Sequence, residues 1–230
     1  MELRDALRTT GAIRQFTDEP VDDQLLFGVL DDARFAPSGG NRQAWRVIVV
    51  RDAIKRRALA AAYLDAWHDY VASLLAGVIP FSPLASGDDR RAVAAQREAA
   101  QARSTPNGFA ETLDRAPALL VVIADLGAFA ATDRDLDRYN LVGGASVYPF
   151  VWSILLAAHD RGLGGVMTTV ATANEPQLRE LFSLPSHFAV AAVVVLGHVE
   201  HRASRLRRRE VSEFTVVDEF SGPAFRPEGR

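Results

Sequence analysis

The sequence predicts a protein of mixed α/β or α+β class, and two kinds of pattern support this prediction. Four segments repeat apolar residues at the 3.6-residue period of a helix, and three or four β-branched runs between them are too short for helices. The chain has 230 residues, of which 48% are hydrophobic, so it can bury a full core. We therefore expect one domain over residues 1–230, without internal repeats.

The composition excludes several classes of function. Because the chain has no cysteine, it forms no disulfide or thiolate-bound metal, and redox chemistry would need a bound organic cofactor or another metal centre. The formal net charge of −3 argues against nucleic acid as a partner. No run approaches the roughly 18 apolar residues of a membrane span, and the opening MELRDALRTT is too polar for a signal peptide. We expect a cytoplasmic protein that does not contact a membrane.

Two helices are predicted at the N-terminus. An amphipathic helix opens the chain and is interrupted at Gly11. Asp22 can cap a second helix, in which Val21 would pack against Leu26. This helix should end at Ala36, because the residue before a proline disfavours helical geometry.

The next segments alternate between turn, strand and helix. Residues 38–41 have turn chemistry, and the β-branched run 47–50 predicts a buried strand. An alanine-rich helix is expected over 53–75, and three of its aromatic residues share one face: Tyr63, Trp67 and Tyr70. The segment 77–116 contains several prolines and glycines around a charged stretch, and we interpret it as an excursion over the main body.

The C-terminal half repeats the alternation. Strands are predicted at 118–124, 165–168 and 189–196, a long helix at 147–158 ended by Gly162, and a short helix capped by Asn174. A polar tail with one short β-branched run follows.

Motifs of other enzyme classes are absent from the sequence. No GxGxxG follows a strand, and there is no P-loop. The five histidines form no HExxH or comparable metal-binding array, so we expect no metal site. No GxSxG elbow is present for a serine hydrolase.

The first candidate binding segment runs from Ala36 to Trp45. Its small residues would let a planar ring approach the backbone closely, and Ser38, Asn41 and Gln43 offer donors and acceptors for a polar ring edge. The alternative is a helix-to-strand turn without a ligand.

Arginines near both ends of the chain form the second candidate. Arg8 and Arg14 precede the first core element, and Arg205, Arg207, Arg208 and Arg209 lie near the C-terminus. Arginines from separate segments can converge on one dianionic phosphate. A solvated charged face is the alternative.

The third candidate runs from Gly162 to Thr169, where glycines lead tightly from a helix into a strand that ends in two hydroxyls. Backbone N–H groups or a threonine hydroxyl there could donate to a ring nitrogen of a cofactor. A glycine helix end followed by an ordinary strand is equally consistent with the pattern.

In order along the chain, these three segments resemble the nitroreductase family of FMN enzymes. The family pattern R-x-F matches Arg14-Gln15-Phe16, and A-P-S-x-x-N-x-Q-P-W matches residues 36–45, with Ala44 in place of the proline. The helix that ends in Gly162-Leu163-Gly164 resembles a later core helix of the family, and Arg208 stands where a phosphate-binding residue is expected.

The resemblance implies an α+β fold with a central mixed β-sheet flanked by helices. It also implies an intertwined homodimer in which each subunit contributes to both FMN sites and the tail 198–230 reaches the partner. The residues that it assigns to cofactor binding are Arg8, Arg14, Pro37, Ser38, Gly39, Asn41, Gln43, Gly164, Gly165, Thr168, Thr169, Arg207 and Arg208.

The chemistry implied by the resemblance is ping-pong hydride transfer. NAD(P)H reduces FMN and leaves, and a small electron-poor acceptor such as a nitroaromatic or quinone then occupies the same pocket. Such chemistry depends on proximity and orientation, so no catalytic side chain is assigned. Residues 77–116 fall where the family varies its lid. Four aromatic residues are candidates for the acceptor pocket, although packing is their other common use: Tyr70, Phe81, Phe109 and Tyr148.

One departure concerns the phosphate. The family has an Arg-Arg-Ser run before R-x-F, and this chain has Thr10-Gly11-Ala12 instead. We hypothesise that Arg8 and the additional arginines around Arg208 compensate for the missing charges. The departure leaves open loosely bound FMN, a deazaflavin as hydride donor, or a flavin-free binding protein. A specialised reaction on the same fold, dehalogenation or flavin fragmentation, is a further alternative.

Overall fold

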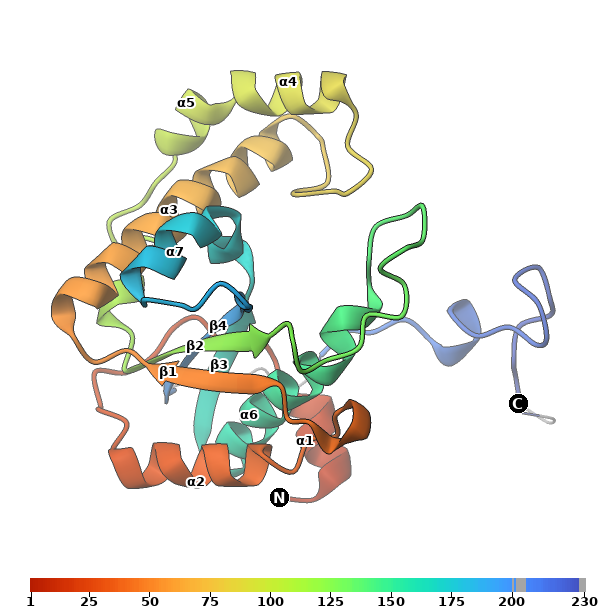
Figure 1. Cartoon of the computed structure of the whole chain (residues 1–230), viewed down its shortest axis with the longest axis horizontal. Helices are drawn as coiled ribbons and strands as arrows, with labels where there is room; N and C mark the ends of the chain where they lie inside the picture. Colours follow the sequence, from red (N-terminus) through yellow and green to blue (C-terminus); the bar gives the residue numbers. More distant parts are fainter. Residues whose placement is uncertain (200, 202–205, 228–230) are drawn as a thin grey trace.

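A computed structural model describes residues 1–199, 201 and 206–227, and its centre is a four-stranded sheet (Figure 1). The strands are β1 (Trp45–Val49), β2 (Ala118–Asp125), β3 (Leu163–Thr168) and β4 (Phe188–His198), in the order β1-β2-β4-β3. All three neighbouring pairs are antiparallel, so the expected mixed sheet is corrected in this detail. A parallel bridge joins Ala12 to Gly165 outside these strands.

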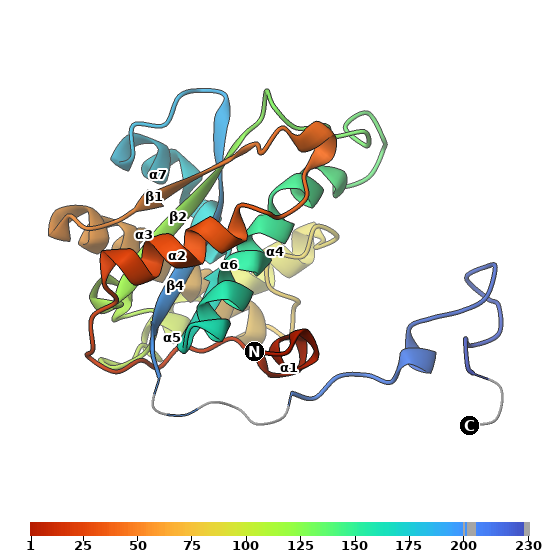
Figure 2. The same cartoon turned by 90° about the horizontal axis from the view of Figure 1, so that it is seen from below.

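Helices cover both faces of the sheet (Figures 1 and 2). Their bounds are α1 Leu3–Thr9, α2 Asp23–Ala33, α3 Ala53–Leu75, α4 Gly87–Ala95, α5 Arg97–Gln101, α6 Tyr148–Asp160 and α7 Glu175–Leu181. The helices α2 and α6 pack on one face, and α3 and α7 pack on the other. The class is therefore α+β, as predicted.

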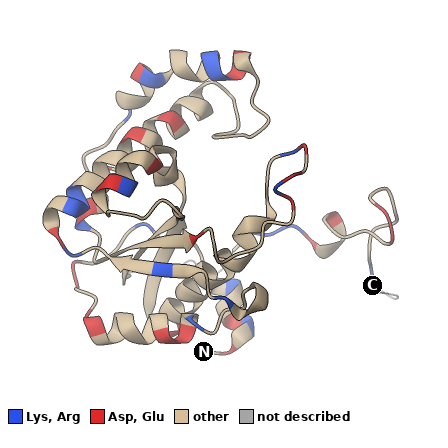
Figure 3. Ribbon diagram, viewed as in Figure 1, with Lys and Arg blue, Asp and Glu red and all other residues tan. Residues whose placement is uncertain are grey.

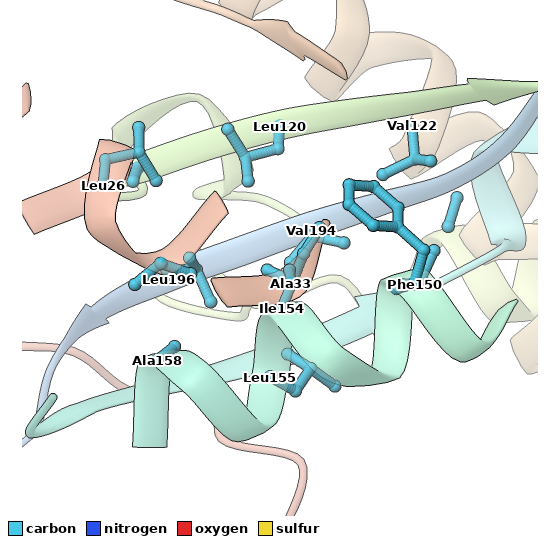
Figure 4. Close-up of a cluster of buried hydrophobic side chains, with 14 of the residues drawn as sticks. Leu26, Ala33, Leu120, Val122, Phe150, Ile154, Leu155, Ala158, Val194 and Leu196 are labelled. Carbon is cyan, nitrogen blue, oxygen red and sulfur yellow. The ribbon is translucent and has the colours of Figure 1, made fainter. Parts of the chain in front are cut away.

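The strand β2 shows how the sequence builds both cores. Leu120 and Val122 face α2 and α6, where they meet Phe150 and Ile154 (Figure 4), while Val121 faces α3. Both faces are buried, which explains the unbroken apolar run in the sequence. Burial of each such side chain stabilises the fold by about 1.5–3 kcal/mol.

The strand β1 differs from its prediction. It pairs with β2 alone and forms an edge of the sheet, and Val49 is 36% exposed, so the expected buried strand is only half-buried. A strand at an edge lacks the second neighbour that would cover it, and four β-branched residues in sequence do not reveal this difference.

Two helix ends also differ from their predictions. Asp22 caps α2 by accepting from the backbone N–H of Leu25 at 2.7 Å, as expected, but α2 ends at Ala33 instead of Ala36. Asn174 precedes α7 without capping it. Its side-chain amide donates instead to the Ala62 carbonyl at 2.8 Å and so ties α7 to α3.

The excursion 77–116 contains α4 and α5, which lie along α3 (Figure 1). Arg97 forms ion pairs with Asp65 and Asp69 of α3 and fixes α5 on that helix. Charged residues of both signs gather on these helices and on the loops, whereas the strands are almost free of them (Figure 3).

The tail extends away from the body of the chain (Figure 2). Its residue Leu206 lies beside the turn after α1, against the position of Gly11. Three of its aromatic residues are exposed: Phe214, Phe220 and Phe225. Within the described residues, no helix combines the length and the apolar character that crossing a membrane requires.

Candidate functional site

The turn between Pro37 and Trp45 has an unusual backbone. Gly40, Asn41 and Gln43 all adopt positive φ, at 61°, 51° and 50°. Glycine adopts this region freely, but other residues adopt it at a cost, so the surroundings must hold the turn in place. The Ser38 hydroxyl accepts from the Gln43 backbone N–H at 3.0 Å, and the Ser146 hydroxyl accepts from the Gly39 N–H at 3.1 Å.

The end of this turn is anchored to α6. The ring of Trp45 stacks on Phe150, with centroids 4.6 Å apart and planes within 8°. Pro37, Asn41 and Gln43 are exposed, and the Gln43 amide donates to Asn41 Oδ1 at 3.2 Å. The turn thus presents polar groups and the small Gly39-Gly40 surface to the outside on a fixed backbone.

A second group forms around Arg14. Its guanidinium lies 5.9 Å from the centre of the Phe109 ring, which packs edge-on against Tyr63. The Tyr63 hydroxyl is hydrogen-bonded to the side chain of Thr168 at the end of β3. The structure therefore brings together three of the predicted site residues, Arg14, Phe109 and Thr168, through a tyrosine that was not predicted as a site residue.

Burial raises the pKa of Tyr63 above its usual value near 10, and this effect exceeds the opposing influence of the Thr168 hydrogen bond and the Arg14 charge. The hydroxyl is therefore neutral at physiological pH. A buried neutral hydroxyl can fix the side-chain orientation of Thr168 without adding charge.

Replacing Tyr63 by Phe should destabilise the protein by about 0.5–1.5 kcal/mol at neutral pH, because Thr168 loses its buried partner. A raised folded-state pKa gives stability that is present below the unfolded pKa and is lost as pH rises through the folded one. The free energy of unfolding of the wild type, measured in urea, should accordingly decrease above about pH 10. In Tyr63→Phe this decrease should be smaller. The exposed Tyr139→Phe is the control, and identical pH profiles for all three proteins would refute this account.

The glycines of β3 serve packing. A Cβ at Gly164 would lie 2.8 Å from the side chain of Ile13, and one at Gly165 would lie 2.5 Å from that of Leu196. Both glycines are buried, and a cofactor contact by either one remains a prediction. Thr169 follows β3 and is exposed.

The remaining predicted phosphate residues are exposed arginines. Arg8 lies in the last turn of α1, and Arg207 and Arg208 follow Leu206 in the tail. Because Leu206 contacts Gly11, the tail arginines leave the body close to the end of α1. Arg205 lies outside the described residues.

Arg14, Gly164 and Gly165 lie at the opposite end of the sheet from the turn 38–43, whereas Thr168 pairs with Val193 between the two ends. The turn 38–43 precedes Trp45, which pairs with Ala124 at the far end of β2. On either side of Arg14, the backbone N–H groups of Ile13 and Thr17 donate to the carbonyls of Gly165 and His198. These two acceptors lie next to the start of β2 at Ala118. Six residues of strand separate these ends by roughly 20 Å. Within one chain, the turn 38–43 and the segment with Arg14 are therefore far apart along the sheet.

The four aromatic residues predicted for an acceptor pocket are also dispersed. Tyr70 stacks on Trp67 at 4.8 Å, in the same row of rings as Tyr63 and Phe109. Phe81 lines a separate cavity of about 610 Å³ between α3 and α4. The Tyr148 hydroxyl donates to the Ala191 carbonyl at 3.2 Å, beside the irregularity in the β2–β4 pairing. Within one chain these residues form no single pocket.

Sequence reasoning missed Ser146, Tyr63 and Arg115. Ser146 follows a Gly-Gly pair and offers no signal of its 107-residue separation from Gly39. The sequence pattern identifies Tyr63 only as part of an aromatic face of a helix. Arg115 lines a cavity with Arg14, but it resembles any other exposed arginine in the sequence.

Comparison with known proteins gives a consistent result. Residues 7–198 match the model of the Nitroreductase family. The chain is 28% identical to an NADH dehydrogenase of Thermus thermophilus over 86% of this chain and 87% of that protein. It is 27% identical to a nitrobenzene nitroreductase of Ectopseudomonas oleovorans, covering 93% and 96% of the two chains. A solved structure of iodotyrosine deiodinase bound to FMN and 3-iodo-L-tyrosine has the same fold, with a TM-score of 0.62 at 23% identity over 91% of this chain and 96% of the other.

Proposed function

Because the chain belongs to the nitroreductase family, we propose that it is a cytoplasmic, homodimeric, FMN-dependent oxidoreductase. It takes hydride from NADH or NADPH and passes it to a small electron-poor acceptor, such as a nitroaromatic or a quinone, by a ping-pong mechanism. The observation that carries the proposal is the turn 38–43, which holds exposed polar groups and two small residues on a constrained backbone.

The turn fits one edge and face of an isoalloxazine ring. At Gly39 even an added Cβ would meet nothing closer than 3.4 Å, so the backbone is open to close approach. Ser38, Asn41 and Gln43 offer donors and acceptors matched to the polar pyrimidine edge of the ring. FMN, when bound, supplies the centre that accepts and donates hydride.

The protein's part in this chemistry is to bind and orient. We assign the ring contacts to Pro37, Ser38, Gly39, Asn41 and Gln43 of one subunit. From the partner subunit we assign Gly164, Gly165, Thr168 and Thr169 to the ring, and Arg14 to the cofactor phosphate. Holding donor and acceptor in turn against the same ring supplies proximity, so the proposed reaction requires no acid–base side chain.

Phosphate binding is assigned to the arginines. Thr10 is buried, and its hydroxyl donates to the Ala6 carbonyl at 2.7 Å, so it does not replace the phosphate-binding run of the family. Arg8, Arg207 and Arg208 are exposed near the end of α1 and take this role in our proposal. The same observation on Thr10 favours the second candidate, a binding protein that holds flavin weakly or not at all.

An absorbance spectrum of the purified protein, with and without added FMN, tests the proposal. We expect a flavin spectrum that bleaches under anaerobic conditions when NADH or NADPH is added. Arg8→Ala combined with Arg208→Ala should weaken FMN binding at least tenfold, because each charge-assisted hydrogen bond contributes about 1.5–3 kcal/mol. No flavin spectrum even with excess FMN would refute the oxidoreductase and support the flavin-free binding protein.

A further inference from the structure

One charged side chain outside the proposed flavin contacts is buried. Asp133 lies in the segment between β2 and α6, and only 2% of its side chain is exposed. Three donors converge on its Oδ2 atom: the Leu141 N–H at 2.7 Å, the Val142 N–H at 3.2 Å and the Arg138 guanidinium at 2.8 Å. The carboxylate therefore ties the two ends of the segment 133–142 together at one oxygen atom.

Packing alone does not account for this buried carboxylate. In the part of the chain that the structure describes, Asp133 Oδ1 is buried without a hydrogen-bond partner. Leaving a buried polar atom unsatisfied costs free energy, so such an atom calls for a reason other than stability. The hydrogen bond from the Leu141 N–H is the largest influence that lowers the pKa of Asp133, and burial opposes it. The group is thus ionised at neutral pH, and a charged acceptor binds its donors more strongly than a neutral one.

The two backbone donors lie at the start of a short 3₁₀ helix, η3 (Val142–Ser146). The first N–H groups of a helix have no partner within it, and an aspartate oxygen is a common acceptor for them. Asp133 supplies that acceptor here. The body of η3 is also closely packed, because a Cβ at Gly143 would lie 3.0 Å from the Phe129 ring. With its start fixed and its side in contact, η3 has little freedom to move.

The other end of η3 holds the proposed flavin turn. Ser146 is the last residue of η3, and its hydroxyl accepts from the Gly39 N–H at 3.1 Å. The helix α6 begins two residues later, and its Phe150 stacks on Trp45. One segment thus contacts both ends of the turn, so a displacement of η3 would disturb both contacts.

We propose that Asp133 is a positioning residue that holds the turn 38–43 in its binding geometry through η3 and Ser146. Its side chain acts on the backbone of η3 and does not itself contact the ligand. A turn that is already fixed loses less conformational entropy on binding. The inference rests on the proposed function for the identity of the ligand, FMN, whereas the linkage from Asp133 to Gly39 lies within the chain.

Amide hydrogen exchange of the flavin-free, full-length protein tests this linkage. Asp133→Ala and Ser146→Ala should each speed exchange of the Gly39 N–H about three- to tenfold, because each change frees this group from its acceptor. The Leu25 N–H at the start of α2 should keep its exchange rate. Asp135→Ala is the matched control, because Asp135 is an aspartate of the same loop whose side chain is 85% exposed. It should leave exchange at Gly39 unchanged.

Titration of the same variants with FMN measures the effect of the linkage on binding. Asp133→Ala and Ser146→Ala should each weaken FMN binding about three- to tenfold. The double variant should bind within about twofold of the weaker single variant, because both substitutions break one linkage. Effects that multiply would overturn the proposal, since Asp133 would then act independently of Ser146.

Unchanged exchange at Gly39 in Asp133→Ala, or equal acceleration at Gly39 and Leu25, would also overturn it. If Asp133→Ala does not fold, Asp133→Asn decides. Its amide oxygen can accept the same hydrogen bonds without charge, so exchange at Gly39 should rise about two- to threefold, and no rise would overturn the proposal. A wild type that binds no FMN would refute the proposed function, while hydrogen exchange would still decide the role of Asp133.

Discussion

Two inactive variants should restore flavin binding when their subunits are mixed. Arg14→Glu places a negative charge where the proposed site needs a positive one. Gly39→Leu covers the surface on which the ring would lie, and we expect it to fold because Gly39 is exposed and an added Cβ would lie 3.4 Å from the Ser146 hydroxyl. Each variant alone should fold and bind no FMN. Because the two positions lie at opposite ends of the sheet, we expect every site to take one of them from each subunit.

The expected recovery follows from the symmetry of a twofold dimer. After equal mixing and subunit exchange, half of the dimers are mixed, and each contains one intact site and one site with both substitutions. Flavin absorbance should therefore recover from near zero to about one quarter of the wild-type amount.

A control distinguishes sites shared between subunits from sites within one chain. The control mixes the double variant with wild type in equal amounts. If the sites are shared between subunits, bound flavin should fall to about one quarter of the wild-type amount, and if each site lies within one chain, it should stay at about half. A mixture of single variants that recovers no flavin, with the double-variant mixture at one half, would show that the site forms within one chain and would contradict the proposed arrangement.

The replacement Gly165→Ala should destabilise the fold by about 1–3 kcal/mol, the cost expected of overpacking a tight core. The added Cβ would lie 2.5 Å from the side chain of Leu196 and 2.9 Å from the backbone oxygen of Val195. The backbone oxygen belongs to the β3–β4 pairing and cannot move without disturbing it. Urea unfolding should show a lower midpoint with an unchanged slope.

The matched control is Gly87→Ala at the start of α4. A Cβ there meets only the end of the Arg91 side chain at 3.5 Å, so stability should stay unchanged or rise by up to about 1 kcal/mol. If Gly165→Ala were as stable as this control, packing would not explain the glycine. The proposed contact of Gly165 with the cofactor would then be the remaining explanation for the glycine, and FMN affinity would measure it.

Several elements could be predicted because their signals are local. The helix α3 spans 53–75 as predicted, and Gly162 ends α6 with a φ of 84° that favours glycine. The buried strands β2 and β4 were recognisable from unbroken apolar runs. Capping residues, helical periodicity and β-branched runs act within a few neighbouring residues, so a single sequence contains them in full.

The candidate site was predictable in part. The turn 38–43 was identified by residue type, and its exposure and its strained backbone agree with a binding role. The dispersion of the four aromatic residues was not predictable, because it depends on where the excursion and the start of α6 lie. A sequence motif shows which chemical groups a segment carries, but it does not show which residues from other segments lie beside them in the fold.

The sequence by itself determined the helices, the central strands and the chemistry of the turn. Only the tertiary structure decided the antiparallel order of the sheet, the edge position of β1 and the placement of Arg14 and Gly39 at opposite ends. It also placed Arg115 beside Arg14. These relations join residues that are tens to more than a hundred positions apart. They are stabilised by the simultaneous packing of the whole core, which cannot be inferred from any short segment of the sequence.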